Sequence, residues 1–238
     1  HVYIDTPETY QIPPPRKPAD KTLAEETLNH KKVERELLIK IESHPLLKPV
    51  YHDQTNLEEE IAIVREIHRE TKNLVYSLLE DARLGKNLNT AGAKKIVGEM
   101  VESVIRNPDA LTCFTQLKKK DEYTAQHSMR VCILALSFGR HLGLEKLELN
   151  TLGLGALLHD IGKMKVPNEI LNKPGPLSDY EYALMKSHVP RGVEILDNTD
   201  GIPRAAIEVA RCHHERYSGA GYIHGLKGDQ IGLFGMIG

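Results

Sequence analysis

Apolar and polar residues alternate along most of this chain at steps of three and four, the spacing that places apolar side chains on one face of a helix. The apolar stripe of the second predicted helix starts at Asn56 and Glu59, which form a helix cap and its acidic partner. The spacing predicts helices at about 20–43, 57–83, 90–106, 124–142, 147–160, 179–197 and 203–216. A strand-like pattern stands out only at 1–5. The chain is therefore predicted to be all-α.

The two halves of the chain differ in their distribution of charged and apolar residues, with a change near residue 109. The first half holds a proline-rich stretch at 7–18, which predicts a stiff linker, and charged helices that favour pairing with other helices or with a second subunit. A homodimer is therefore one expectation. In the second half apolar helices follow one another, a loop is predicted at 163–176, and a glycine-rich loop follows His214. We predict two regions, 1–108 and 109–238.

Composition narrows the class of protein. The chain has 238 residues, 40% of them hydrophobic and 27% charged, with no Trp, which favours a globular helical protein over a sandwich or barrel. Its net charge of −2 argues against general binding to a nucleic-acid polymer. The three cysteines form no CxxC pair, so a reducing, cytoplasmic setting is expected. No apolar run reaches the length of a transmembrane helix, and no signal peptide opens the chain.

The candidate chemistry is concentrated in one pentapeptide, His159-Asp160-Ile161-Gly162-Lys163, which follows an apolar helical run. Imidazole and carboxylate groups bind divalent metals, and a carboxylate can bridge two of them. The lysine can then contact a phosphate oxygen as a point charge. The pentapeptide therefore indicates metal-assisted phosphate chemistry.

Further histidines fall on the neighbouring predicted helices. His127 is expected to point into the bundle, on a helix whose apolar face is formed by Val131, Leu134, Ala135 and Phe138. His188 lies within the helix at 179–197, and the pair His213-His214 closes the last helix. Each could instead be a packed core histidine or, for the pair, a charge at a helix C-terminus. One metal site inside the bundle accounts for all of them together.

The histidines stand in an ordered set of motifs: Tyr123-Thr124-Ala125-Gln126-His127-Ser128, His159-Asp160-Ile161-Gly162-Lys163, Met185-Lys186-Ser187-His188 and His213-His214-Glu215-Arg216-Tyr217-Ser218-Gly219-Ala220-Gly221-Tyr222. In this order they resemble the HD-GYP phosphodiesterases, a subgroup of the HD-domain phosphohydrolases, over about residues 109–238. The start of the chain, 2–6, looks like the tail of an accessory domain that often precedes HD-GYP domains in bacteria. The resemblance implies an HD-type helical bundle.

The resemblance also implies an activity and a site. The activity is hydrolysis of a cyclic dinucleotide, typically cyclic di-GMP, to linear pGpG or to GMP, and a GGDEF-type cyclase is an implied partner. The implied cofactors are two divalent metal ions, iron or manganese, which activate a water. The implied metal ligands are His127, His159, Asp160, His188, His213 and His214. Asp160 would bridge the metals, and Lys163 would contact the scissile phosphate. Further substrate contacts are expected from Arg191, Gly221, Tyr222 and Lys227.

The chain departs from the family pattern in three places. Ser218 stands where an aspartate is usual and Ile223 where a proline is usual, which bears on substrate preference and partner contact. Tyr123 replaces the glutamate of members that bind three metals, so two metals are expected. The family has a further ligand aspartate just beyond the run at 231–238, so the domain is expected to be incomplete at its C-terminal end.

Two alternatives to cyclic di-GMP hydrolysis stay open from the sequence. The domain could be a non-catalytic module that senses a cyclic dinucleotide or binds a partner, although a pure receptor has no chemical need for the retained ligands. It could also be an enzyme that prefers cyclic GMP-AMP, since no base-reading residue is identifiable. A simpler hydrolase of mononucleotides would not require the glycine-rich segment after His214.

Overall fold

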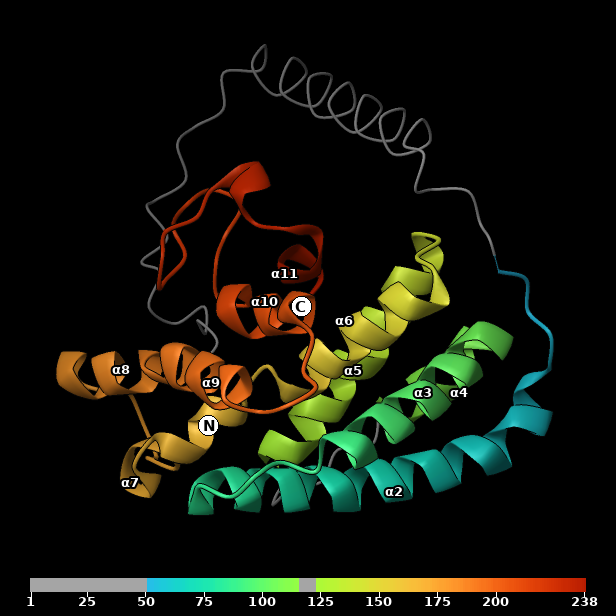
Figure 1. Cartoon of the computed structure of the whole chain (residues 1–238), viewed down its shortest axis with the longest axis horizontal. Helices are drawn as coiled ribbons and strands as arrows, with labels where there is room; N and C mark the ends of the chain where they lie inside the picture. The colour runs from blue at the N-terminus through green and yellow to red at the C-terminus, as the bar shows by residue number, and fades with distance from the viewer. Residues whose placement is uncertain (1–50, 116–122) are drawn as a thin grey trace, which may run out of the picture. The chain divides into compact units, whose positions relative to one another are not determined.

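The computed structural model of the chain describes residues 51–115 and 123–238, which belong to one compact unit, Pro49–Gly238. Figure 1 shows how the helices of this unit are arranged. They are α2 (Leu57–Leu84), α3 (Thr90–Arg106), α4 (Pro108–Thr115), α5 (Tyr123–His141), α6 (Lys146–Leu158), α7 (Asn168–Leu171), α8 (Asp179–Lys186), α9 (His188–Asp197), α10 (Arg204–Cys212) and α11 (Leu233–Ile237), with the 3₁₀ helices η2 (Ile161–Lys165) and η3 (Gly228–Gln230). The described residues contain no strand, so the all-α prediction is confirmed for them. The predictions for 1–5, 7–18 and 20–43 lie outside the described residues.

Helix α6 forms the centre of the core. It contacts α3, α5 and α10, and its second half, 152–158, is buried on every face. A helix that is apolar all round is stable only where neighbours cover it all round. Each leucine buried there contributes about 1.5–3 kcal/mol. The last turn of α6 is therefore held firmly, and the two residues that follow it are His159 and Asp160.

Helices from both sides of residue 108 contribute to this core, because α2 and α3 contact α5 and α3 contacts α6. The predicted cap of α2 is confirmed: Asn56 accepts a hydrogen bond from the backbone N–H of Glu59. One turn in, Glu60 is 1% exposed and accepts hydrogen bonds from the guanidinium of Arg106 at the end of α3. A buried carboxylate requires such a partner. The pair fixes the start of α2 against the end of α3.

The prediction of a single helix at 179–197 is wrong. The chain forms two helices there, α8 and α9, which meet at Ser187. The break follows from Pro190, which lacks the N–H that would donate to the carbonyl of Lys186 in a continuous helix. The hydroxyl of Ser187 donates to the carbonyl of Leu184 and so helps to end α8. As a result His188 begins a helix instead of lying in the middle of one. The loop predicted at 163–176 also contains a helical turn, α7.

The apolar face predicted for α5 is only partly correct. Leu134 and Phe138 are 52% and 50% exposed, whereas Ala135 is buried. The face that enters the core is formed by Ala125, Met129, Cys132, Ile133, Ala135 and Leu136. Apolar residues cover more than half of the circumference of α5, so periodicity alone did not determine which part faces inward. Among the described helices, none is both long enough and apolar enough to cross a membrane.

Candidate metal centre

Four parts of the bundle deliver the side chains of the candidate site. His127 comes from α5, His159 and Asp160 lie between α6 and η2, His188 begins α9, and the pair at 213–214 follows α10. The structure brings all six predicted ligands together. Their ligand atoms form two sets: the His159 set (His127, His159, Asp160) and the His188 set (Asp160, His188, His213, His214). Asp160 belongs to both sets.

Gly162 explains how α9 comes so close to the His-Asp pair. A Cβ atom built on Gly162 would lie 1.9 Å from the carbonyl oxygen of His188 and 2.4 Å from the backbone nitrogen of Gly192. Both are backbone atoms, so only glycine permits this approach of η2 to α9. The glycine in the pentapeptide therefore determines the distance between Asp160 and His188.

Hydrogen bonds to the backbone fix the orientation of three imidazole rings. The Nδ1 atoms of His159, His188 and His213 lie 2.7, 2.7 and 2.8 Å from the carbonyl oxygens of the residues three positions earlier. A carbonyl only accepts hydrogen bonds, so Nδ1 carries the hydrogen and Nε2 carries a lone pair. The Nε2 atoms point into the site. This arrangement, with one nitrogen held by a carbonyl and the other turned inward, is typical of metal-ligating histidines.

The inward nitrogens approach one another closely. The Nε2 atoms of His188 and His213 are 3.1 Å apart, and those of His159 and His127 are 3.3 Å apart. In the first pair both nitrogens carry lone pairs, so neither can donate a hydrogen bond to the other. Two such lone pairs at this distance repel unless a cation lies between them. The donor set therefore fits a metal ion.

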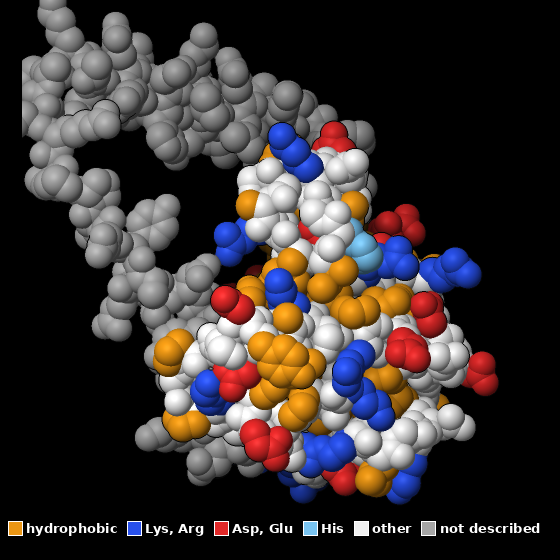
Figure 2. Space-filling model, turned by 90° about the vertical axis from the view of Figure 1, so that its left-hand side faces the viewer, with side chains coloured by type: hydrophobic (Ala, Val, Ile, Leu, Met, Phe, Trp, Pro, Cys, Tyr) orange, Lys and Arg blue, Asp and Glu red, His pale blue; other side chains and the backbone are white. Residues whose placement is uncertain are grey.

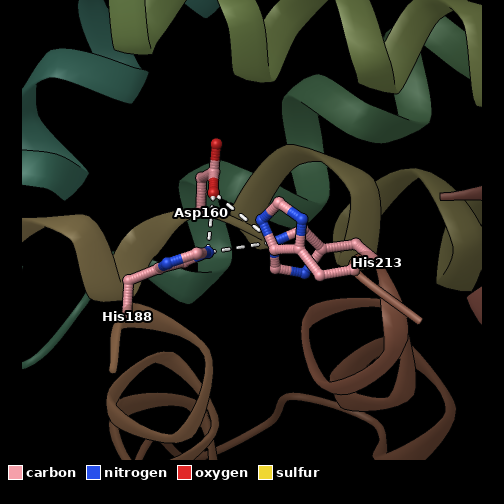
Figure 3. Close-up of side chains that lie close together, drawn as sticks. Asp160, His188 and His213 are labelled. Atoms are coloured by element: carbon pink, nitrogen blue, oxygen red, sulfur yellow. Dashed lines mark hydrogen bonds and ion pairs between the residues drawn. The ribbon is translucent and has the colours of Figure 1, made fainter. Parts of the chain in front are cut away.

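The two oxygens of Asp160 serve different sets. Figure 3 shows the carboxylate of Asp160 facing His188 and His213. Oδ1 lies 3.5 Å from Nε2 of His188 and 3.6 Å from Nε2 of His213, and it has no hydrogen-bond partner although it is buried. Oδ2 lies 3.4 Å from Nε2 of His127 and 3.2 Å from Nε2 of His159. A buried carboxylate oxygen without a partner is costly, which again fits a bound cation. The geometry matches a carboxylate shared between two ions.

Burial favours the neutral form of His127, His188 and His214. Burial lowers the pKa of His127 and His188 to about 4 and that of His214 to about 2. Burial alone would raise the pKa of Asp160, but the neighbouring His159 and the ammonium group of Lys163 outweigh it, so this pKa lies well below its ordinary value. Neutral imidazoles and an ionised carboxylate are the forms that bind a divalent cation.

The predicted substrate residues lie in different surroundings. Lys163 is 5% exposed, and its Nζ lies 2.6 Å from Oδ2 of Asp160. Tyr222 stacks on the ring of His214, with centroids 4.6 Å apart and planes 20° from parallel. Arg191 instead donates to the backbone carbonyl of Lys165, so it holds η2 against α9. Lys227 is exposed on the glycine-rich loop. Their roles toward a substrate stay predictions.

Gly221 lets the glycine-rich loop fold back over the site. A Cβ atom on Gly221 would lie 2.5 Å from the backbone nitrogen of Arg216 and 2.6 Å from the carbonyl oxygen of His214. That close return brings the N–H of Tyr222 within 3.2 Å of the same carbonyl oxygen. Glu215 holds the far side of the loop, because its carboxylate accepts hydrogen bonds from the N–H groups of His224 and Leu226 at 2.7 and 2.9 Å. Glu215 was not predicted as a site residue.

Two further residues lie beside the site that the sequence patterns did not indicate, Tyr182 and Lys186 of α8. The ring centroids of Tyr182 and Tyr222 are 6.3 Å apart, and Nζ of Lys186 lies over both rings. The one local signal was their spacing of four residues, which places them on the same helix face. Their shared partner, Tyr222, is distant in sequence, so the spacing gave no reason to connect them with the histidines.

Comparison with known proteins identifies the class to which this fold and site belong. A family model described as "HD domain" matches residues 112–237, and the chain belongs to this family. The family-level resemblance drawn from the sequence is thereby confirmed. A solved structure, the HDG"Y"P protein of Bdellovibrio bacteriovorus, superposes with a TM-score of 0.61 at 23% identity, covering 72% of this chain and 55% of that one. That similarity supports the HD-type bundle.

Two curated relatives are more specific. The chain is 42% identical over 182 residues to a cyclic di-GMP phosphodiesterase of Pseudomonas aeruginosa, an alignment that covers 76% of this chain and 44% of the relative. It is 36% identical over 122 residues to 3'3'-cGAMP-specific phosphodiesterase 2 of Vibrio cholerae, which covers 51% of this chain and 23% of that protein. The chain therefore spans less than half the length of these two relatives.

Proposed function

We propose that this chain is the hydrolytic part of a cyclic-dinucleotide phosphodiesterase, which cleaves cyclic di-GMP to linear pGpG or GMP with two divalent metal ions, iron or manganese. The observation that carries the proposal is the position of Asp160, whose two oxygens face two separate sets of histidines. Two ions close together are suited to cleaving a phosphodiester, because they can stabilise the attacking and the leaving oxygen. The names of the two relatives supply the substrate class.

The residues of the chain take distinct roles in this proposal. When bound, the two ions activate a water and neutralise the charge of the phosphate. Asp160 is the shared ligand, and its burial keeps the carboxylate oriented between the two sets. The hydrogen bonds from Nδ1 to backbone carbonyl oxygens hold the imidazoles so that Nε2 points into the site. Lys163, which reaches the same carboxylate, is placed to contact a phosphate oxygen as charge develops on it.

Incubation of the chain with cyclic di-GMP and Mn²⁺ or Fe²⁺, followed by chromatography of the nucleotides, tests the activity. We expect pGpG or GMP to accumulate, and Asp160→Ala to abolish turnover while the circular dichroism spectrum stays helical. Absence of product from the unmodified chain, with bound metal confirmed by elemental analysis, would refute the enzymatic proposal. Turnover by the Asp160→Ala variant would refute the role of Asp160.

A preference for cyclic GMP-AMP is the second candidate, because the Vibrio cholerae relative is specific for 3'3'-cGAMP. A side-by-side measurement of kcat/KM on the two dinucleotides decides between them. The non-catalytic alternative predicts tight binding of the nucleotide in calorimetry without hydrolysis. The retained set of six candidate ligands counts against it, since binding a nucleotide does not require two buried sets of histidines.

A further inference from the structure

A group of three side chains lies beside the metal centre, on α8 and on the glycine-rich loop. We call Tyr182, Lys186 and Tyr222 the aromatic–lysine group. Nζ of Lys186 lies 4.9 Å from the ring centroid of Tyr182 and 5.9 Å from that of Tyr222. The Tyr222 ring also stacks on His214, a candidate metal ligand. Lys186 is thus only two contacts away from the metal centre.

The positive charge of Lys186 is not neutralised by a carboxylate in the described part of the chain. Lys186 forms no ion pair with a carboxylate among the described residues, whereas Lys173, nearby in sequence, pairs with Glu181 of the same helix α8. A position in the last turn of α8 favours a positive charge, but it does not require the side chain to lie over two rings. An ammonium group held over aromatic rings and without an anionic partner can still bind an anion.

The group is open to solvent on one side. Tyr182 is 47% exposed, so a planar ligand can reach its ring. Figure 2 views the side of the molecule on which α8 lies in Figure 1, and there hydrophobic side chains lie next to lysine and arginine side chains. Aromatic rings beside positive charges are the features that bind bases and phosphates of nucleotides.

We propose that the aromatic–lysine group binds the half of the cyclic dinucleotide that is not cleaved, with Lys186 on the second phosphate and Tyr182 stacked on a nucleobase. This inference rests on the proposed function, and it locates the binding site for the uncleaved half of the cyclic dinucleotide. Such a ligand carries two phosphates in one ring, so fixing one phosphate beside Asp160 leaves the other for a cation nearby. Stacking on tyrosine and pairing with an ammonium group accept any base. The group therefore adds affinity without distinguishing cyclic di-GMP from cyclic GMP-AMP.

The test compares two substrates with the metal-loaded chain: cyclic di-GMP, and bis(p-nitrophenyl) phosphate, which carries a single phosphate and no nucleobase. We expect Lys186→Met and Tyr182→Ala each to raise KM for cyclic di-GMP about tenfold, the size of one stacking or charge contact. The effect on the small diester should be far smaller. Lys186→Arg and Tyr182→Phe should restore most of the affinity, because they keep the charge and the ring.

Tyr180→Ala is the matched control, because Tyr180 lies on the same helix and is 74% exposed. It should leave KM for cyclic di-GMP unchanged. Equal losses on both substrates, or no change in KM for cyclic di-GMP, would overturn the inference. If the unmodified chain binds cyclic di-GMP without cleaving it, the same comparison is made on Kd, and a tenfold weakening supports the inference although the proposed hydrolysis has failed. A metal-loaded chain that neither binds nor cleaves cyclic di-GMP refutes both.

Discussion

Nζ of Lys163 lies 2.6 Å from Oδ2 of Asp160, one turn away along η2, and both side chains are buried. The ammonium and the candidate metal ions thus share one carboxylate. An ion pair this deeply buried is costly to break on one side, because the remaining charge loses its partner. We propose two separable roles for Lys163, one in balancing the charge of Asp160 and one in contacting phosphate.

Replacement of Lys163 by methionine separates these roles. Methionine fills a similar volume without charge, and bound divalent ions can take over the balancing of Asp160. We expect Lys163→Met to keep its bound metal and to lose about 10²–10³-fold in kcat, the cost of one charge-stabilising group. Elemental analysis and steady-state rates on cyclic di-GMP measure the two quantities. Loss of the metal from the variant would show that Lys163 maintains the site instead of acting in the reaction.

Gly162→Ala should open the contact between η2 and α9. The new Cβ would meet backbone atoms of His188 and Gly192, which have no alternative rotamer to adopt. We expect the free energy of unfolding to fall by about 2–3 kcal/mol, as measured by urea denaturation. Gly98→Ala in α3 is the control, because its Cβ would make an ordinary contact at 3.6 Å with Asn150. That change should leave stability equal or raise it by up to about 1 kcal/mol. Equal effects at both positions would contradict the packing argument.

The stability of the metal-free chain should depend on pH through its buried histidines. His127 and His188 have their pKa lowered to about 4 in the folded state, whereas the unfolded value is near 6.5. The unfolded chain therefore binds more protons between these values. The free energy of unfolding should be constant with respect to these groups above pH 6.5 and should fall as the pH drops toward 4. Urea titrations of chelator-treated protein across this range measure it, and stability that rose on acidification would contradict the burial of neutral imidazoles.

Gly221→Ala should disturb the glycine-rich loop without removing a metal ligand. A Cβ there would collide with the backbone at 214–216, so Tyr222 could no longer rest on His214. We expect an unchanged metal content and a KM for cyclic di-GMP raised about tenfold, since an aromatic contact is lost. Gly232→Ala provides the comparison, because no atom lies within 4 Å of its Cβ position. If both variants behaved alike, the stacking of Tyr222 would have no part in binding.

Much of the site could be predicted from the sequence because its ligands occur in short motifs at the ends of helices. His159 and Asp160 are adjacent, and the last pair of histidines ends a strongly amphipathic segment. The position of His188 was found from its motif, although the break at Ser187 that places it was not predicted. That break depends on Pro190, and the spacing of apolar residues takes no account of the missing N–H of proline.

The residues that were not predicted depend on tertiary contacts. Tyr182 and Lys186 meet Tyr222 only after the glycine-rich loop has folded back over His214. Likewise, the exposed positions Leu134 and Phe138 follow from where the neighbouring helices lie and not from the period of α5. The sharing of Asp160 was expected from the family resemblance, but which oxygen faces which set of histidines depends on the folded arrangement of the helices.

The shared position of Asp160 is tested most directly by counting metal ions. The unmodified chain and Asp160→Asn are saturated with Mn²⁺, freed of excess metal by gel filtration and analysed for metal per chain. We expect about two ions for the unmodified chain and fewer than one for the variant, because both sets of histidines lose the same ligand. An unmodified chain that holds no more than one ion, or a variant that keeps two, would contradict a dinuclear centre bridged by Asp160.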